Sequence, residues 1–167
     1  RVYHLPLPQM VGEGIFVKEI VEELLSKKID MAVHSMKDVP TDIPEGLVIA
    51  AVLKREDPSD ALISHHYASL LDLPRGAVVG TSSLRRRLQV LDRNPFVVVK
   101  DIRGNVDTRL RKLDAGEYDA VIMATSGLKR LGLHHRIREN LDFLPAMGQG
   151  ALCVEIRKED LETLIKY

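Results

Sequence analysis

Between residues 77 and 132 the sequence shows the same pattern three times: a short, uninterrupted apolar segment followed by a helical segment. The apolar segments are residues 77–79, 96–99 and 120–124. Strands that are apolar along their whole length are typical of a mostly parallel sheet that helices cover on both faces. The pattern therefore predicts the α/β class. In the first of these helices the apolar positions are Leu84, Leu88 and Leu91.

The first third of the chain predicts a helix followed by short strands. Residues 16–28 place apolar side chains at helical spacing and charged side chains on the opposite face, as in an amphipathic helix. A short apolar segment at 31–33 follows directly, and further apolar segments lie at 47–52 and 61–63. We expect these three segments to form strands.

Two segments indicate a division into domains. Residues 54–58 are charged and end in proline, and residues 145–150 are small and glycine-rich. We interpret them as paired hinges at which the chain leaves the first domain and returns to it. Domain 1 is then formed by residues 1–54 and 148–167, and domain 2 by residues 58–146, which are inserted into domain 1.

Composition excludes several classes of protein. The 167 residues contain 24 basic and 24 acidic side chains and no tryptophan, which argues against a generic nucleic-acid binder. A single cysteine, Cys153, excludes an internal disulfide framework and fits a reducing compartment. No apolar run approaches the roughly 20 residues that cross a bilayer. We therefore expect a cytoplasmic protein without a membrane partner.

Basic residues are concentrated in one part of this neutral chain. Between residues 81 and 112 there are nine basic residues against three acidic ones. Solvated helix faces would account for about half of them, which are Arg87, Arg93, Arg111 and Lys112. The remaining basic residues lie close to turns that follow predicted strands, and their position calls for another explanation.

The turn VVGTSSLRR combines several features of an anion site. It places Ser83 where a helix begins after a strand, and free backbone N–H groups and the positive end of the helix dipole bind anions there. Arg85 and Arg86 lie in the first helical turn, where cations are unfavourable to the dipole. Helix capping explains the serine but leaves the arginines unexplained, whereas a bound anion explains both.

Two further turns repeat this arrangement. Arg103 precedes a Gly-Asn turn and Arg109 lies in the helix that follows, while Gly127 and Arg130 lie just after the third strand. In an open parallel sheet these turns meet at the carboxyl edge, where ligands bind. Guanidinium groups bind carboxylates through two parallel hydrogen bonds. The pattern favours a ligand with several carboxylates, and phosphate or nucleic acid remains an alternative.

The segment DMAVHSMKDVPT ends an apolar strand with Ser35, Lys37 and Asp38. One interpretation is a strand end that reaches solvent, where polar residues are expected. The other is a catalytic carboxylate beside an anion-binding cation at the end of a sheet.

Five motifs stand in the order and spacing of one known family: VHSMKDVPT, GTSSLRR, RGNVDTRL, GLKRLGL and LPAMGQGAL. The chain resembles porphobilinogen deaminase, also called hydroxymethylbilane synthase, from about residue 12 to about residue 157. This resemblance implies a two-domain clamp like that of periplasmic binding proteins, followed by a third domain. It also implies that the chain lacks the third domain and the family's N-terminal strand and helix.

The resemblance implies a transferase of tetrapyrrole and heme biosynthesis. The family joins porphobilinogen units head to tail, with release of ammonia, into hydroxymethylbilane on a covalently held dipyrromethane cofactor. Asp38 would be the catalytic carboxylate close to the pyrrole nitrogens. The residues that would hold the cofactor are Lys37, Asp38, Ser83, Arg85, Arg86 and Arg109. The residues that would bind substrate are Ser35, Phe16, Arg103, Gly127, Arg130 and Gln149.

The resemblance also sets expectations about cofactor attachment and assembly. The family attaches dipyrromethane through a cysteine of the third domain, whereas Cys153 lies in an apolar segment that predicts a buried strand. We therefore expect this chain alone to be inactive, and the protein to be a monomer without a metal or a nucleic-acid partner. The loop before Phe16 carries Gln9 and Glu13 where the family usually has lysines.

Two rival functions come from other classes. The same fold serves as an anion-binding clamp without chemistry. Asp38 separates the two functions, because a carboxylate in a cleft for carboxylates is unfavourable to binding and has a reason there only if it catalyses. A nucleic-acid binder is the third interpretation, and it is weakened by the scarcity of aromatic side chains and by the zero net charge.

Overall fold

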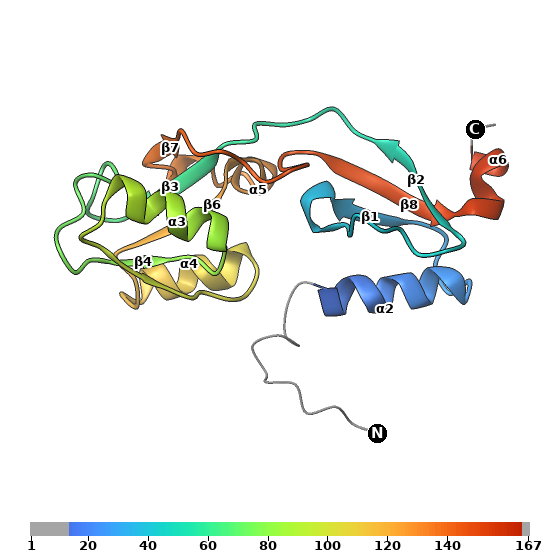
Figure 1. Ribbon diagram of the computed structural model, residues 1–167, viewed down its shortest axis with the longest axis horizontal. Helices are drawn as coiled ribbons and strands as arrows, with labels where there is room; N and C mark the ends of the chain where they lie inside the picture. The colour runs from blue at the N-terminus through green and yellow to red at the C-terminus, as the bar shows by residue number, and fades with distance from the viewer. Residues whose placement is uncertain (1–13, 165–167) are drawn as a thin grey trace, which may run out of the picture. The chain divides into compact units, whose positions relative to one another are not determined.

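A computed structural model of the chain describes residues 14–164, apart from the side chains of the first four and last two of these residues (Figure 1). Gln9 and Glu13 lie outside the described residues. The chain divides into two compact units: unit 1 comprises residues 1–55 and 151–167, and unit 2 comprises residues 56–150. The two junctions lie next to the segments from which the domain boundaries were predicted.

Unit 1 is built on a three-stranded sheet of order β1-β8-β2, in which both pairs of strands are antiparallel. One helix, α2, covers a face of this sheet (Figure 1). The elements of the unit are α2 (Gly14–Leu25), β1 (Ala32–Ser35), η1 (Met36–Asp38), β2 (Leu47–Val52), β8 (Leu152–Arg157), η3 (Lys158–Asp160) and α6 (Leu161–Leu164).

Helix α2 ends at Leu25, earlier than its apolar pattern predicts. Lys27 has a φ of 61°, and the amide of Lys28 donates to the carbonyl of Glu23 at 3.0 Å, which together form a left-handed C-terminal turn. Arg157 of β8 donates from Nη1 to the carbonyl of Leu24 at 2.9 Å. The carbonyl of Leu24 near the helix end thus accepts from a side chain of the sheet as well as from the amide of Lys27, at 3.0 Å.

Unit 2 contains a five-stranded sheet of order β5-β4-β6-β3-β7. Strand β4 pairs in parallel with β5 and β6, whereas β3 pairs antiparallel with β6 and β7. The sheet of unit 2 is therefore mixed and that of unit 1 is antiparallel, because an uninterrupted apolar segment indicates burial and leaves strand direction open. The strands are β3 (Asp60–Ser64), β4 (Val78–Gly80), β5 (Val98–Lys100), β6 (Ala120–Ala124) and β7 (Glu139–Leu141).

The direction of β3 decides which residues share one edge of this sheet. Because β4, β5 and β6 are parallel, their carboxyl ends lie at the same edge, as the sequence predicts. Strand β3 runs the other way, and its first residue, Asp60, lies opposite Ala124 at the end of β6. An acidic residue at the start of one strand therefore lies beside the turns that follow the other three.

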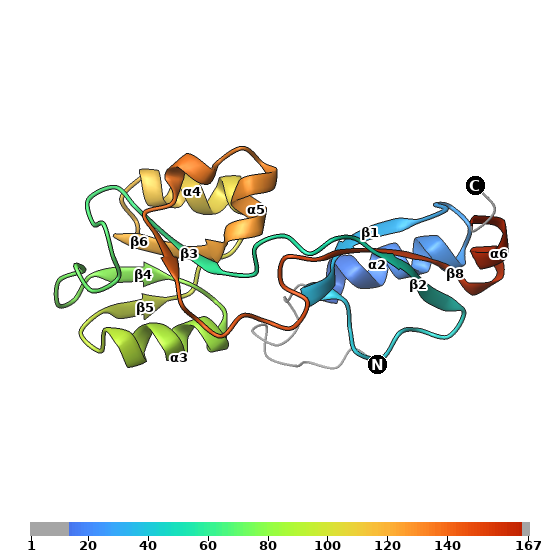
Figure 2. The ribbon, with the colours of Figure 1, turned by 90° about the horizontal axis from the view of Figure 1, so that it is seen from above.

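Helices cover both faces of the sheet in unit 2 (Figure 2). Helix α3 packs on one face through Val90, and helices α4 and α5 pack on the other through Leu110, Leu113 and Leu128. The two cores confirm an α/β unit in which β3 and β6 are buried from both sides, whereas β5 at the sheet edge is largely exposed. The helices are α3 (Leu84–Arg93), α4 (Val106–Asp114) and α5 (Thr125–Arg130), followed by the short η2 (His134–Arg136).

Helix α3 does not bury the leucines that mark it in the sequence. Leu84 and Leu88 are 69% and 61% exposed, and Leu91 is 36% exposed, whereas Arg86 and Val90 are buried. The ion pair between Arg86 and Asp60 turns the stripe that contains residues 86 and 90 toward the sheet. The leucines lie on other faces of the helix, and for this reason they face solvent.

Gly150 closes unit 2 at a point where the entering and leaving chain segments meet. Its φ is +93°, and a Cβ atom placed on it would lie 2.3 Å from the carbonyl oxygen of Glu56. The Gly150 carbonyl accepts a hydrogen bond from the amide of Glu56 at 3.0 Å. The glycine is therefore required both by backbone conformation and by this close approach.

Among the described residues, no helix combines the length and the apolar character that a membrane span needs.

Replacing Gly150 by alanine tests this packing. We expect Gly150→Ala to lower the free energy of unfolding by more than about 2 kcal/mol, because strain at positive φ adds to a clash with backbone. Gly116→Ala is the matched control, since Gly116 has a φ of +76° but no atom within 4 Å of an added Cβ. Urea unfolding measures both variants, and equal losses would contradict the packing argument.

Candidate functional site

The carboxylate of Asp60 is the centre of a buried polar cluster at the carboxyl edge of the unit 2 sheet. Asp60 is fully buried, and Arg86 contacts its Oδ1 atom twice, from Nε at 2.9 Å and from Nη2 at 2.7 Å. The remaining Nη1 of Arg86 donates to the carbonyl of Ile122 in β6 at 3.3 Å. Arg86 is therefore held by directed contacts on every nitrogen of its guanidinium group.

Arg85 reaches the same carboxylate in a different way. Its Nη1 lies 2.7 Å from Oδ2 of Asp60, yet this oxygen has no hydrogen bond of suitable direction within the described part of the chain. The contact is thus held by charge more than by direction. Arg85 also donates to the carbonyl of Leu144, and its side chain is 23% exposed, against 6% for that of Arg86.

Gln149 completes the cluster from the segment that leaves unit 2. Its Nε2 donates to Oδ1 of Asp60 at 2.9 Å and to the carbonyl of Pro58 at 2.6 Å. Its Oε1 accepts from Nη2 of Arg86 at 3.4 Å. The amide can act as donor and acceptor at once, so it pairs with the carboxylate and with a guanidinium group.

The electrostatics of the cluster favour an ionised Asp60. Burial alone would raise the pKa of this carboxyl, because the interior disfavours charge. The contact with Arg85, the charge of Arg86 and the hydrogen bond from Gln149 oppose burial and lower the pKa below its ordinary value. Two guanidinium groups and one carboxylate leave the cluster with one net positive charge.

The serines of the preceding turn organise the start of α3. Ser83 is the N-cap and accepts a hydrogen bond from the amide of Arg86 at 3.4 Å. The hydroxyl of Thr81 accepts from the amide of Ser83 at 3.2 Å, and that of Ser82 donates to the carbonyl of Ile102 at 2.9 Å. These contacts fix the turn that carries both arginines.

The next turn along the sheet edge carries Arg103 and Arg109. Asn105 caps α4 by accepting from the amide of Thr108 at 2.9 Å, and Nε of Arg109 donates to the carbonyl of Gly104 at 2.7 Å. Arg109 is half-buried, whereas Arg103 is exposed. Two further guanidinium groups therefore belong to the turn that follows β5.

Helix α5 directly follows β6, and its two basic residues contact the chain segments that enter and leave unit 2. Arg130 donates from Nη2 to the carbonyl of Gly150 at 2.7 Å. Lys129 lies 3.1 Å from the carboxylate of Asp57 and 3.3 Å from that of Glu56, and these contacts raise its pKa, Asp57 more than Glu56. Gly127 of the same helix has no atom within 4 Å of an added Cβ.

Unit 1 places Ser35, Lys37 and Asp38 at the end of β1. The strand ends at Ser35, and the single turn η1 that follows is closed by a hydrogen bond from the amide of Val39 to the carbonyl of Met36 at 3.3 Å. Lys37 is exposed, and Ser35 and Asp38 are half-buried. Phe16 lies in α2, but its side chain is outside the description.

A buried pair of polar side chains, His34 and Glu155, lies next to this strand end. Nε2 of His34 lies 3.1 Å from Oε2 of Glu155, and His34 is paired with Cys153 across the sheet. Cys153 is fully buried, and burial, with a smaller effect of the charge on Glu155, raises the pKa of its thiol. Its environment is therefore that of an inert core cysteine.

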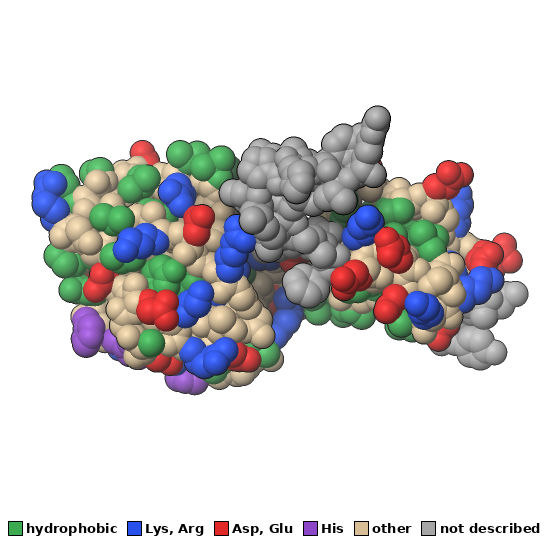
Figure 3. All heavy atoms as spheres, turned by 90° about the horizontal axis from the view of Figure 1, so that it is seen from below, with side chains coloured by type: hydrophobic (Ala, Val, Ile, Leu, Met, Phe, Trp, Pro, Cys, Tyr) green, Lys and Arg blue, Asp and Glu red, His purple; other side chains and the backbone are tan. Residues whose placement is uncertain are grey.

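Several of the other basic residues have surface partners, as the interpretation of solvated helix faces predicts. Arg87 pairs with Asp101 at 2.8 Å and Arg93 approaches Asp142 at 3.7 Å. On the face shown in Figure 3, the described basic and acidic side chains alternate and do not merge into one basic surface. The arrangement on this face differs from the continuous basic stripe of a nucleic-acid binder.

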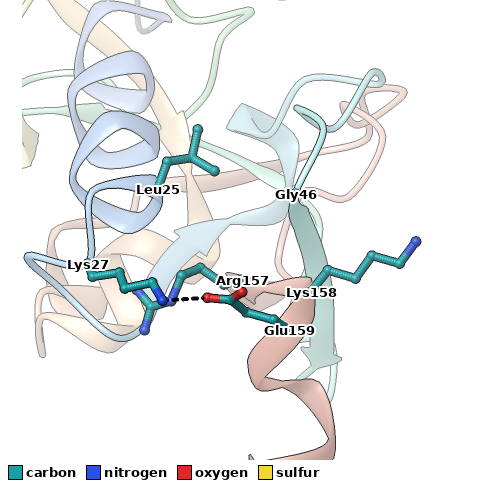
Figure 4. A pocket seen from close by; sticks show the side chains of 6 residues that line it. All are labelled: Leu25, Lys27, Gly46, Arg157, Lys158 and Glu159. Carbon is teal, nitrogen blue, oxygen red and sulfur yellow. Dashed lines mark ion pairs between the residues drawn. The ribbon is translucent and has the colours of Figure 1, made fainter.

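A hollow of about 590 Å³ lies elsewhere, in unit 1 (Figure 4). Two of its cations are already engaged, since Lys27 pairs with Glu159 at 2.8 Å and Arg157 holds the end of α2. Its described lining consists of Leu25, Lys27, Gly46, Arg157, Lys158 and Glu159, which are different from the predicted site residues. Among the described residues, no group of three potential metal ligands occurs.

The structure brings some of the predicted site residues together and adds Asp60, which the sequence did not indicate. Arg85, Arg86 and Gln149 share one carboxylate, and Ser83 caps the helix that carries the arginines. The sequence pattern did not indicate Asp60, because this residue precedes an apolar segment and the predicted sheet edge collects residues that follow strands. The signal that could have found it is an acidic residue directly before the apolar segment 61–63.

Sequence comparison places the chain among known relatives. A sequence model of the family described as "Porphobilinogen deaminase, dipyromethane cofactor binding domain" matches residues 1–165. The porphobilinogen deaminase of Laribacter hongkongensis is 55% identical to the chain over 170 residues. This match covers 99% of the chain and 55% of the relative, so the chain spans about half the length of that curated relative.

Solved structures share the fold at low sequence identity. A pheromone precursor lipoprotein of Enterococcus faecalis matches with a TM-score of 0.58 and 15% identity, over 92% of this chain and 83% of that chain. A periplasmic substrate-binding protein of an ABC transporter from Coxiella burnetii matches with a TM-score of 0.57 and 17% identity, over 87% and 73%. These likenesses confirm the predicted fold of periplasmic binding proteins, and they show the fold alone.

The unequal burial of the two arginines predicts unequal effects on stability. Arg86→Leu should lower the free energy of unfolding by about 3 kcal/mol or more, because it removes the directed partner of a buried charge. Arg85→Leu should cost about 1 kcal/mol, since Arg85 is more exposed and less directed. Chemical denaturation at neutral pH measures both variants, and equal losses would contradict the different roles.

Proposed function

The chain belongs to the porphobilinogen deaminase family, and from this membership we propose that it supplies the catalytic carboxylate and the carboxylate-binding cations of a hydroxymethylbilane synthase. This transferase joins porphobilinogen units head to tail into hydroxymethylbilane for tetrapyrrole and heme biosynthesis. One ammonia leaves for each bond that forms. The observation that carries the proposal is the cluster of two arginines and Gln149 around Asp60 at the carboxyl edge of the unit 2 sheet.

The chemistry of porphobilinogen matches this edge. Each pyrrole carries an acetate and a propionate group, so a growing chain presents many carboxylates. Guanidinium groups are suited to such a ligand, because each can bind one carboxylate through two hydrogen bonds. Arg85 and Arg86 lie in the first turn of α3, which follows β4. After β5, Arg103 lies in the connecting turn and Arg109 in α4. A linear product with regularly spaced carboxylates would engage these turns in succession.

The residues of this edge also fit a dipyrromethane group, since the Asp60 cluster retains one net positive charge. When bound, this group supplies the pyrrole to which the first substrate unit is joined. We assign its carboxylates to the side chains that resemble the family's cofactor-binding positions, which are Lys37, Ser83, Arg85, Arg86 and Arg109. Asp38 would lie near its pyrrole nitrogens.

We assign the catalytic role to Asp38. Departure of ammonia leaves a cationic methylene group on the substrate pyrrole, and a carboxylate held nearby stabilises this charge as it develops. The same carboxylate can act as a general base for the proton that the acceptor pyrrole loses when the new carbon–carbon bond forms. For substrate binding we propose Ser35, Phe16, Arg103, Gly127, Arg130 and Gln149.

Two of these substrate assignments have a further role within unit 2. Arg130 holds the carbonyl of Gly150, and Gln149 is hydrogen-bonded inside the cluster. Either residue would bind substrate in addition to this contact, or after exchanging it. Arg103 is exposed and would meet a ligand carboxylate without giving up a contact with the described residues.

The second candidate function is an anion-binding protein without chemistry. The fold of substrate-binding proteins favours it, but at 15% and 17% identity this likeness concerns the fold alone. The half-buried Asp38 separates the two functions, because a carboxylate weakens the binding of a carboxylate ligand, and this cost has a reason where the carboxylate also acts in the reaction. We further propose a cytoplasmic monomer that uses neither a metal nor a nucleic-acid partner.

Replacing Asp38 tests the catalytic assignment. In a protein that joins this chain to the cofactor-bearing cysteine, Asp38→Ala should lower kcat by at least about 100-fold, because it removes charge stabilisation made in the transition state. The KM for porphobilinogen should change little. Asp42→Ala is the control, since Asp42 is an exposed acid of the same segment. Release of ammonia measures both, and a kcat within a few-fold of the parent would exclude the assignment.

The environment of Cys153 predicts that it does not carry the cofactor. The buried thiol should stay unmodified when the folded chain is incubated with porphobilinogen, because burial keeps it protonated and inaccessible. Intact-protein mass spectrometry makes the measurement. A thiol reagent added to the unfolded chain serves as the positive control for detection. A stable adduct of dipyrromethane mass on Cys153 would overturn the assignment.

A further inference from the structure

Asp60 holds its two arginines in two different ways. Arg86 is almost fully buried: its Nε donates a directed hydrogen bond to Oδ1 of Asp60 at 2.9 Å, and its Nη2 lies 2.7 Å from the same oxygen. Arg85 is partly exposed and approaches the other oxygen, which lacks a well-directed hydrogen bond within the described residues. Arg86 is thus fixed on the carboxylate by a directed hydrogen bond. Arg85 donates instead to the carbonyl of Leu144 and to Oε1 of Gln149, and its ion pair with Oδ2 is a contact that it can exchange for a ligand carboxylate.

Stability alone gives little reason for this arrangement. Burying a carboxylate with two guanidinium groups carries a desolvation cost, and well-packed apolar residues often serve stability equally well. Both arginines also lie in the first turn of α3, where the helix dipole disfavours cations. One carboxylate offsets one of the two positive charges, and the cluster keeps the other for a further anion.

We propose that Asp60 is a positioning residue of the carboxylate-binding site: it fixes Arg86 and presents Arg85 to a ligand carboxylate. This inference rests on the proposed function, to which it adds a residue. Arg85 would leave Oδ2 of Asp60 for the ligand, while Arg86 stays on Oδ1. Gln149 keeps Oδ1 hydrogen-bonded throughout, because its Nε2 contacts the same oxygen as Arg86.

Positioning and simple charge predict opposite effects of removing this carboxylate. Asp60→Asn raises the net charge of the cluster from one to two, since two guanidinium groups then face a neutral amide. Coulomb attraction alone would make the variant bind an anion more tightly. If Asp60 positions the arginines, the two like charges separate and the variant binds more weakly.

The test uses a ligand that binds but cannot react. The probe is the analogue of porphobilinogen that lacks the aminomethyl group, a pyrrole with one acetate and one propionate. Isothermal titration calorimetry on the chain gives the dissociation constant and the stoichiometry separately. We expect Asp60→Asn to raise the dissociation constant at least tenfold at unchanged stoichiometry. Asp114→Asn is the matched control, since Asp114 pairs with Arg136 on the surface of the same unit, and its affinity should equal that of the parent.

The outcomes separate the inference from the function on which it rests. A parent chain that does not bind the probe contradicts the proposed function, and the inference with it. A parent that binds, with equal or tighter binding by Asp60→Asn, overturns the inference alone. A lowered stoichiometry at an unchanged dissociation constant also overturns it, because a purely structural role reduces the folded fraction without altering the site.

A second variant covers the case in which Asp60→Asn fails to fold. Asp60→Glu keeps the charge that Arg86 needs but displaces the carboxylate by one methylene group. If position is what matters, the dissociation constant of this variant should also rise at least tenfold. A value within threefold of the parent would show that charge alone suffices, and would overturn the inference.

Discussion

The buried carboxylate of Asp60 is the interaction on which the organisation of unit 2 depends. Through it the start of β3 contacts the first turn of α3 and the segment that leaves the unit, and Arg86 extends the link to β6. A buried charge is stable only when its partners surround it, so these segments must meet at one place. The meeting place is the edge at which the turns after β4, β5 and β6 lie. The need to surround the buried carboxylate of Asp60 with partners therefore also brings the arginines of the unit to this edge.

The periodicity of the sequence was sufficient to predict the α/β class and the position of most strands, because burial leaves a direct trace in composition. It was not sufficient for strand direction, and the antiparallel course of β3 moved Asp60 to an edge where strand ends alone were expected. Helix α3 shows the same limit. Its leucines gave a regular apolar pattern, yet the helix turns Arg86 inward, because an ion pair made across 26 residues outweighs the local pattern.

In the candidate site, too, some residues could be predicted from the sequence and some contacts could not. Arg85 and Arg86 could be found from sequence because cations in a first helical turn are locally unfavourable and demand a reason. The contacts of Arg130 and Gln149 could not be found, since their partners, the carbonyls of Gly150 and Pro58, are backbone groups that a sequence does not display. A side chain that donates a hydrogen bond to the backbone leaves no compositional signal, even when it lies next to residues that we propose to bind ligand.

In a protein proposed to bind carboxylates, each acid placed among the functional residues needs a reason not to repel the ligand. Asp60 meets this requirement by burial and pairing, because its charge is offset by Arg86 before any ligand arrives. Asp38 has a different environment. It is half-buried in the turn η1, directly after β1, in which the buried His34 pairs with Glu155 of β8. Two acids in one protein can thus serve different ends: the proposed role of Asp60 is to position arginines, and that of Asp38 is to act in the reaction. On this argument, the repulsion that Asp38 exerts on a ligand is tolerable only if the same charge is used when ammonia departs, and for this reason we place the chemistry on Asp38 and the positioning on Asp60.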